Sequence, residues 1–202
     1  MHILLTDILT CPRCGPGFGL ILLADRVEHR RVRTGRLGCS NCREKYEIRD
    51  GTVDFGATME RVDQAVDDAG AERLAGLLGV TRGPAFLLLA GPAAAHAAAI
   101  AGMLDDVEVL TINNAGAESD PAPGVNRIFT GGPQLPIASA KIAGVALTGP
   151  TADALLDEGA RAVSPGGRLV LDPAPPDAAE RLVRHGMRIA AQQDGTAVAV
   201  RV

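Results

Sequence analysis

Four cysteines, the only ones among the 202 residues, form two CxxC pairs near the start of the chain. The pairs are Cys11–Cys14 and Cys39–Cys42, and residues 15–38 separate them. Two residues between cysteines let one tight turn present both sulfurs to one ion, and two such turns complete a tetrahedral thiolate site. We therefore predict one structural zinc ion held by all four cysteines. A closed four-sulfur site leaves no open coordination position, so the prediction concerns folding rather than catalysis.

Two disulfides or four buried thiols are the alternatives for these cysteines. The stretch from Met1 to Asp7 lacks the charged start and long apolar core of a secretory segment. We therefore expect a cytoplasmic, reducing location, where disulfides are rare. Redox chemistry is less favoured than zinc, because the two pairs leave no further cysteine to act as a resolving partner.

Composition excludes several classes of function. The longest apolar stretch, around residues 93–103, is interrupted by His96 and is too short to cross a membrane. Aromatic residues make up only 2% of the chain, so a base-stacking platform for single-stranded nucleic acid is excluded. Residues 1–55 carry nine basic and seven acidic residues. Contact with RNA through Arg26–Arg36 stays open, but the small excess favours a solvated face.

The residues around the cysteines predict a small β-rich ribbon. We expect a short helix or turn over 4–9, strands over 20–23 and 26–33, and a hairpin over 46–55 that turns at Asp50–Gly51. A ribbon of this size buries too little surface to fold alone. Metal binding would therefore supply much of its stability.

Three segments of this ribbon resemble a known family. They are Asp7-Ile-Leu-Thr-Cys-Pro-Arg-Cys14, Cys39-x-x-Cys42 and Tyr46-x-Ile-Arg-Asp-Gly51. Together they resemble the zinc-ribbon family of tRNA-methyltransferase activators, a ribbon also found fused to the N-terminus of bacterial methyltransferases. The resemblance covers residues 3–55. It implies that the ribbon binds and stabilises a methyltransferase domain.

The rest of the chain alternates between strands and helices. Residues 57–80 have a helical pattern, with Met59, Val62, Ala65 and Val66 on one face. From residue 85 onward, apolar runs alternate with helical segments, which predicts an α/β fold with a doubly wound, mostly parallel sheet and an antiparallel end. The predicted strands are 86–90, 107–112, 125–130, 142–147 and 168–172, followed by a hairpin over 187–202. We expect a zinc ribbon over 1–56, a helical connector over 57–84 and a Rossmann-type domain over 85–202.

The last of these segments resembles class I S-adenosylmethionine-dependent methyltransferases. Residues 156–171 resemble the helix, Pro-Gly-Gly turn and fifth strand of that family, and Leu135-Pro-Ile resembles its Leu-Pro-Phe segment. The resemblance covers residues 70–202. It implies a cofactor site at the carboxyl ends of the strands.

The positions at which this family binds its cofactor have lost their acids. The acid of the first turn is replaced by Leu88, and of the glycines there only Gly91 remains. The second strand ends in Asn113–Asn114, with no carboxylate, and residues 131–134 hold none on the adenine side. These losses together predict that affinity for S-adenosylmethionine is reduced or lost.

A few residues remain as candidates for a ligand site at this edge. Gly91 can let the backbone approach a ligand, and Asn113 and Asn114 can hydrogen-bond a ribose. Asp172 lies at the end of the fifth strand, where ligands of open α/β sheets bind. His96 is a possible base, although a helical histidine is more often structural. The other acids near this edge, Glu118 and Asp120, fall in a predicted loop.

Two hypotheses of different classes follow. The favoured one is a non-catalytic zinc-binding protein with a degenerate methyltransferase fold, which serves as a binding, stabilising or assembly subunit for a protein partner or a second copy. The alternative is an active S-adenosylmethionine-dependent methyltransferase with a divergent cofactor pocket. Resemblance in fold does not establish activity. The loss of the acids at the cofactor positions therefore favours the non-catalytic hypothesis.

Overall fold

The structure is a computed structural model that describes residues 1–56, 68–114, 121–132 and 134–202. The helical pattern predicted around Met59–Val66 and the loop acids Glu118 and Asp120 lie outside these residues.

The N-terminal ribbon is a four-stranded antiparallel sheet preceded by a short 3₁₀ helix. Its elements are η1 (Ile3–Asp7), β1 (Leu20–Glu28), β2 (Arg31–Cys39), β3 (Lys45–Arg49) and β4 (Thr52–Asp54). The predicted turn at Asp50–Gly51 joins β3 to β4, with φ of 47° and 73°, as a tight hairpin requires. The helix, the hairpin and the first strand lie where the sequence predicts them.

The strand predicted over 26–33 is wrong. His29 and Arg30 adopt left-handed φ values of 47° and 63° and form the turn between β1 and β2. Neither residue is the glycine or asparagine that normally marks such a turn, so the alternating pattern appeared continuous in the sequence.

The second half of the chain has alternating strands and helices, as predicted. Its elements are α1 (Asp68–Leu78), β5 (Ala85–Ala90), η2 (Gly91–His96), α2 (Ala97–Met103), β6 (Val107–Ile112), β7 (Val125–Phe129), β8 (Ile142–Thr148), α3 (Thr151–Ala154), α4 (Leu156–Ala162), β9 (Val163–Asp172), α5 (Ala178–Arg184), β10 (Met187–Gln193) and β11 (Thr196–Arg201). Strands β5 to β9 are parallel, and β11 runs antiparallel between β9 and β10. The predicted fold class is confirmed.

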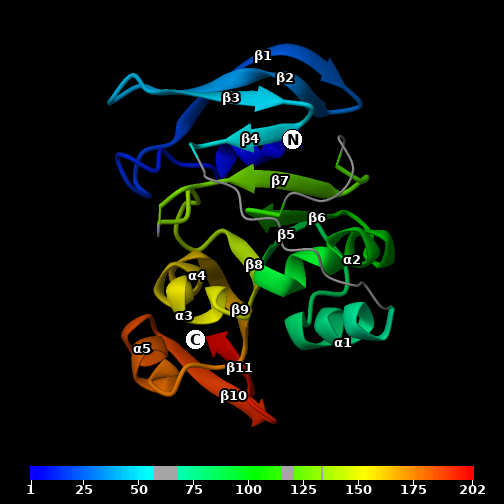
Figure 1. Cartoon of the computed structure of the whole chain (residues 1–202), viewed down its shortest axis with the longest axis vertical. Helices are drawn as coiled ribbons and strands as arrows, with labels where there is room; N and C mark the ends of the chain where they lie inside the picture. Colours follow the sequence, from blue (N-terminus) through cyan, green and yellow to red (C-terminus); the bar gives the residue numbers. More distant parts are fainter. Residues whose placement is uncertain (57–67, 115–120, 133) are drawn as a thin grey trace.

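All strands belong to one sheet, in the order β1-β2-β3-β4-β7-β6-β5-β8-β9-β11-β10. Figure 1 shows the ribbon strands stacked directly above β7. The join is a short parallel pairing in which Val53 lies opposite Ile128 and Asp54 opposite Phe129. The ribbon therefore extends the sheet of the second half. The division into 1–56, 57–84 and 85–202 stays a prediction.

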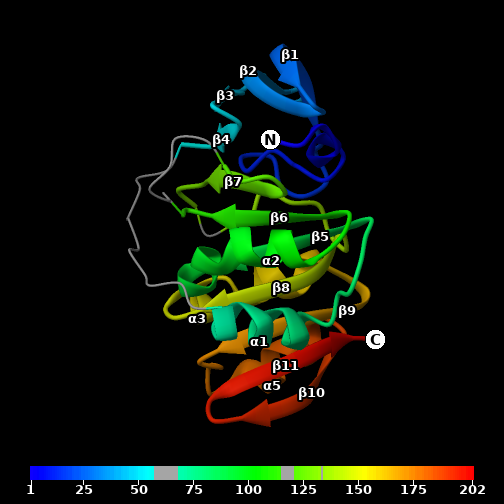
Figure 2. The same ribbon diagram turned by 90° about the vertical axis from the view of Figure 1, so that its right-hand side faces the viewer.

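Helices cover both faces of the sheet, as a doubly wound fold requires. Helices α1 and α2 pack on one face, and Figure 2 shows them in front of β5 and β8. Helices α3, α4 and α5 pack on the other face, together with residues of the ribbon. In that cluster, fully buried Leu5 and Leu9 share one core with Leu110 and Ile128. Each such leucine contributes roughly 1.5–3 kcal/mol through burial, so ribbon and sheet stabilise each other.

The ribbon also pairs with the loop between β7 and β8. The Thr10 amide donates to the Pro136 carbonyl at 2.9 Å, and the Ala138 amide donates to the Ile8 carbonyl at 2.8 Å. Between them, Leu9 forms an antiparallel bridge with Ile137. The Leu135-Pro-Ile segment is therefore positioned by backbone pairing with the ribbon.

Helices α3 and α5 both begin without a side-chain capping bond. The Thr151 hydroxyl donates to the Thr148 carbonyl at 2.7 Å, and Pro150 occupies the N-cap position. Asp177 occupies the N-cap position of α5 without a side-chain capping bond. Among the helices described, none is long and apolar enough to cross a membrane.

A polar network joins the ribbon to the amino ends of β6 and β7. The Arg31 guanidinium donates to both oxygens of Glu108 at 3.0 Å, and the Asn126 amide nitrogen donates to Glu108 Oε2 at 2.7 Å. The His2 backbone amide donates to Asn126 Oδ1 at 2.6 Å. These bonds link residues far apart in the chain and help to determine how the ribbon docks.

Acid is expected to weaken this junction through His2. Burial lowers the pKa of His2 below 6.5. The positive charge of Arg31 adds to this effect, and the negative charge of Glu108 opposes it. The unfolded chain therefore binds the proton more readily, so the stability that neutral His2 contributes is present above pH 6.5 and is lost as pH falls below it. Between about pH 7.5 and 5.5, the urea midpoint of the wild type should fall further than that of His2→Gln. The two proteins differ only at residue 2, so equal falls in the urea midpoint would contradict a contribution from His2.

Candidate functional site

The four cysteine sulfurs lie within 4.8 Å of one another. The Sγ atoms of Cys11 and Cys42 are 3.6 Å apart, and those of Cys39 and Cys14 are 3.8 Å apart. Tetrahedral Zn–S bonds of about 2.3 Å require sulfur separations of about 3.8 Å, so the quartet fits a zinc ion. Cys11 and Cys39 are buried, whereas Cys14 and Cys42 are half-buried. The spacing of the two CxxC pairs thus correctly predicts that the four cysteines come together.

Two further side chains form hydrogen bonds with these sulfurs, and the spacing of the cysteines does not identify either of them. The Tyr46 hydroxyl lies 3.2 Å from Cys11 Sγ, and the Asn41 amide nitrogen donates to Cys14 Sγ at 3.3 Å. Donors to metal-bound thiolates fix their orientation and offset their charge. Tyr46 is the single tyrosine of the chain and opens the Tyr46-x-Ile-Arg-Asp-Gly51 segment, which are the two signals that could have drawn attention to it.

The thiols differ in how readily they lose a proton. Backbone amides of Cys42 and Asn41 lower the pKa of Cys39 to about 7, so its thiolate is available at neutral pH. The amide of Glu44 lowers the pKa of Cys42, but desolvation and the neighbouring thiols outweigh it and raise that pKa to about 12. Burial, with the contact to Cys11, raises the pKa of Tyr46 and keeps its hydroxyl protonated as a donor. Metal binding must therefore displace protons from the quartet.

The second candidate region is the edge of the sheet where the parallel strands end. Gly91 and Asn113 directly follow β5 and β6, and Asp172 is the last residue of β9, so the topology brings all three to this edge. Ligands of open α/β sheets bind at such edges. Asn114 is half-buried beside Asn113.

The turn after β5 is packed against the turn after β8. Gly91 has φ of 69°, and a Cβ built on it would lie 2.1 Å from the Thr148 carbonyl oxygen. The Ala93 amide donates to Thr148 Oγ1 at 2.7 Å, and this hydroxyl donates to the Ala90 carbonyl at 3.2 Å. The backbone donor that such a turn would offer to a ligand is therefore already bonded to Thr148.

The Asn113 side chain is also fully engaged. Its Oδ1 accepts from the Thr130 amide at 2.8 Å, and its amide nitrogen donates to the Thr130 carbonyl at 2.9 Å. Asn113 has φ of 54°, a conformation that asparagine tolerates better than most residues. Only an amide can both accept and donate here, so a carboxylate could not make the same pair of bonds.

Asn113→Asp is therefore expected to destabilise the protein. The carboxylate would face the Thr130 carbonyl without a proton to donate, at a cost of about 1–3 kcal/mol in the free energy of unfolding. Chemical denaturation of the full chain measures the change. Asn114→Asp is the control, with an expected change of about 0.5 kcal/mol or less. Unchanged stability in Asn113→Asp would show that the bonds to Thr130 contribute nothing.

Leu88, which stands where the acid of the first turn was expected, is buried in the core. It is 0% exposed, as are its neighbours Leu87 and Leu89, so no position in this part of β5 presents a side chain to a ligand. The carboxylate of Asp172 is accessible, with 41% of its side chain exposed, and lies 3.9 Å from the Arg73 guanidinium. His96 is half-buried at the end of η2, and its buried Nδ1 has no hydrogen-bond partner among the residues described.

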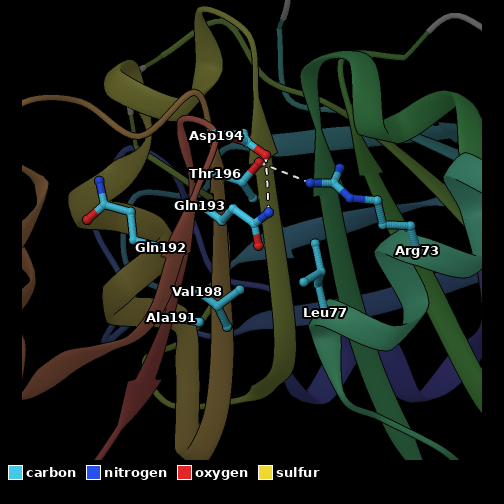
Figure 3. Close-up of a pocket in the computed structure, with 8 residues that line it drawn as sticks. All are labelled: Arg73, Leu77, Ala191, Gln192, Gln193, Asp194, Thr196 and Val198. Carbon is cyan, nitrogen blue, oxygen red and sulfur yellow. Dashed lines mark hydrogen bonds between the residues drawn. The ribbon is translucent and has the colours of Figure 1, made fainter.

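A shallow groove lies between α1 and the β10–β11 hairpin (Figure 3). Its volume is about 250 Å³, and Arg73 points from α1 toward the turn of the hairpin. The Arg73 guanidinium donates to Thr196 Oγ1 at 3.1 Å, and the Gln193 amide donates to Asp194 at 3.2 Å. These polar groups are bonded to one another, and no sequence motif marks this groove.

Several arginines of the Arg26–Arg36 stretch pair with acids. Arg26 and Arg33 both bind Glu28, and Arg31 binds Glu108. These ion pairs neutralise part of the basic stretch within the chain.

Comparison with known proteins agrees with both halves of the structure. Residues 2–51 match the family model described as Trm112p-like protein. No curated protein matches the chain.

Solved methyltransferases resemble most of the chain. A geranyl diphosphate methyltransferase in complex with SAM is 13% identical, with a TM-score of 0.50 over 67% of this chain and 86% of that one. A chain from the complex of the Haloferax volcanii Trm112 methyltransferase activator with its proposed methyltransferase is 11% identical, with a TM-score of 0.49 over 65% and 88%. Geranyl diphosphate C-methyltransferase from Streptomyces coelicolor A3(2) is 13% identical, with a TM-score of 0.49 over 66% and 79%.

At identities of 11–13%, these solved structures are evidence for the fold of the chain and not for its activity. The chain thus combines a Trm112p-like zinc-ribbon module at residues 2–51 with a methyltransferase-like α/β fold.

Proposed function

We propose that this protein is a non-catalytic, zinc-binding cytoplasmic subunit whose ribbon stabilises its own methyltransferase-like domain. Cys11, Cys14, Cys39 and Cys42 would hold the zinc ion, and the methyltransferase-like domain would bind or assemble with a protein partner rather than transfer methyl groups. When bound, the zinc ion supplies folding free energy to the ribbon.

The packing of the turn after β5 is the main support for the proposal that the protein is not a methyltransferase. A cofactor at this edge needs backbone donors and room beside the turn, but the Ala93 amide is bonded to Thr148 and Gly91 touches the same residue. The neutral Asn113, bonded twice to Thr130, supports the same conclusion.

The contacts between the ribbon and the rest of the same chain support the proposal that the ribbon stabilises its own methyltransferase-like domain. Strand β4 pairs with β7, and residues 8–10 pair with residues 136–138 of the same chain. An edge strand left unpaired at β7 would expose backbone groups and the apolar surface around Ile128. The ribbon therefore serves its own domain, and these contacts are not available to a separate methyltransferase.

Titration calorimetry with S-adenosylhomocysteine tests the non-catalytic part. The full chain, loaded with one zinc ion, should give no binding heat with ligand up to about 1 mM, which corresponds to a binding free energy weaker than about −4 kcal/mol. Measuring zinc content on the same sample ensures that the ribbon is folded. A dissociation constant in the micromolar range would overturn the proposal.

An active methyltransferase with a divergent pocket is the second candidate, and the exposed Asp172 favours it. This carboxylate belongs to the last residue of β9, at the ligand edge, and is the accessible acid among the predicted site residues. Micromolar binding in the titration, lost in Asp172→Ala, would support this candidate. Contact with RNA through Arg26–Arg36 has less support, because the glutamates described above neutralise part of this stretch.

A further inference from the structure

Strand β1 ends the sheet at the ribbon side, and its outward edge has no strand partner among the residues described. Figure 1 shows it as the outermost strand, at the opposite end of the molecule from β10. Its side chains are unusually apolar for such a position. Ile21 is 57% exposed, Leu23 is 50% exposed and the preceding Phe18 is 44% exposed. Long apolar edges promote pairing with another strand, and soluble proteins usually protect them.

The two faces of β1 differ. Leu20 is buried, and Leu22 packs against the core that contains the cysteines. Ile21 and Leu23 point to the opposite face, where Leu23 lies across from Arg36 of β2, which in turn lies across from Glu47 of β3. The strand therefore presents exposed apolar side chains beside an open backbone edge.

The regular part of β1 is short. A bulge interrupts the pairing with β2 between Ala24 and Arg26, and the charged Asp25 and Arg26 follow. Gly35 allows close approach at this point, since a Cβ there would lie 2.5 Å from the Leu23 carbonyl oxygen. Bulges and charges normally stop edge pairing, so only residues 20–24 are suited to it.

We propose that a second copy of this chain pairs with β1 through residues 20–24, antiparallel and about a twofold axis at Leu22. In antiparallel strands, directly opposed side chains share one face. With the axis at Leu22, Ile21 lies opposite the partner's Leu23 on the exposed face, and Leu20 lies opposite the partner's Ala24 on the inner face. Each exposed apolar residue thus covers another.

No charge opposes this register. Residues 20–24 carry no charged side chain. Asp25 and Arg26 follow at the bulge, where Arg26 donates to Glu28 of its own chain. A twofold pairing of this kind is closed, so it yields a dimer rather than a fibre. The edge strand at the other end of the sheet, β10, finishes in exposed Gln192 and Gln193 and offers no matching apolar segment. The inference is independent of whether the protein is catalytic.

Sedimentation velocity of the zinc-loaded full chain tests the dimer. At about 50 μM, a concentration at which a micromolar dimer is mostly formed, we expect twice the chain mass of 20.8 kDa. Leu23→Lys should shift the protein to monomer, with at least a tenfold weaker dimerisation constant. Val183→Lys is the matched control, since Val183 is 70% exposed on α5, far from β1, and should leave the dimer intact. A monomeric wild type, or a dimer unaffected by Leu23→Lys, would overturn the proposal.

A double variant tests the register. Ile21→Glu combined with Leu23→Lys places opposite charges face to face twice in the proposed dimer, so dimerisation should recover relative to Leu23→Lys alone. A double variant that remains monomeric, with its zinc content and thermal midpoint unchanged, would contradict the axis at Leu22.

Discussion

Cys11→Ser is expected to abolish zinc binding and to unfold residues 1–55. Cys11 is fully buried and its Sγ lies 3.6 Å from that of Cys42, so loss of this ligand opens the centre of the site. Structural zinc supplies about 10–16 kcal/mol to small zinc-dependent modules, which is more than a ribbon of this size gains from its own core. Metal analysis and far-UV circular dichroism of the full chain measure the effect.

Ser40→Ala is the control for this variant, because Ser40 is exposed in the second CxxC pair and binds no metal. It should retain one zinc ion per chain. If both Cys11→Ser and Cys42→Ser kept their full metal content, the four-cysteine site would be wrong. The shared core around Leu5, Leu9 and Ile128 leads us to expect that the sheet over 85–202 also loses stability when the ribbon unfolds.

Glu108→Ala is expected to lower the free energy of unfolding by about 3 kcal/mol. The Glu108 side chain is 19% exposed, and that of its partner Arg31 is 20% exposed. Removing the carboxylate deprives Arg31 of its two bonds to Glu108 and leaves the Asn126 amide nitrogen without its 2.7 Å acceptor. Breaking a buried ion pair in this way leaves an uncompensated charge, which costs several kcal/mol. Urea denaturation of the zinc-loaded chain measures the loss.

Glu28→Ala provides the comparison for this variant. Glu28 also binds arginines, Arg26 and Arg33, but on the exposed surface of the ribbon. Its removal should shift the urea midpoint much less, because water solvates these charges when the partner is lost. Similar shifts in the two variants would show that the junction does not depend on Glu108.

Local patterns predicted most elements of the fold. The spacing of the cysteines predicted that their sulfurs meet, and apolar runs predicted the strands from β5 to β9. The Asp50–Gly51 turn fixed the β3–β4 hairpin. These features depend on residues close together in the chain. The turn at His29–Arg30 was missed because neither residue signals a left-handed conformation.

The join between the two halves could not be predicted. Strand β4 has three residues, and nothing in Thr52–Asp54 specifies that its partner is β7, more than seventy residues away. The same holds for Arg31 and Glu108, which are 77 positions apart. Long-range pairing of this kind depends on how surfaces fit in three dimensions rather than on a local pattern.

The candidate site was predicted in part. The loss of acids at the cofactor positions was visible in the sequence, but the contacts that fill their place were not. The sequence predicts Asn113 as a neutral ribose ligand, whereas the structure bonds its side chain to Thr130. No sequence pattern identifies Thr148 as the residue that accepts a hydrogen bond from the amide of the turn after β5. Tyr46 and Asn41 act on the cysteines through space, which spacing rules do not report.

Hydrogen–deuterium exchange before and after zinc removal tests most directly whether the ribbon stabilises its own domain. In the zinc-loaded chain, amides of residues 125–138 should be protected, because β7 pairs with β4 and the Ala138 amide donates to the Ile8 carbonyl. After chelation, we predict that protection is lost over residues 125–138 as well as in the ribbon. Faster exchange confined to residues 1–56 would contradict the account.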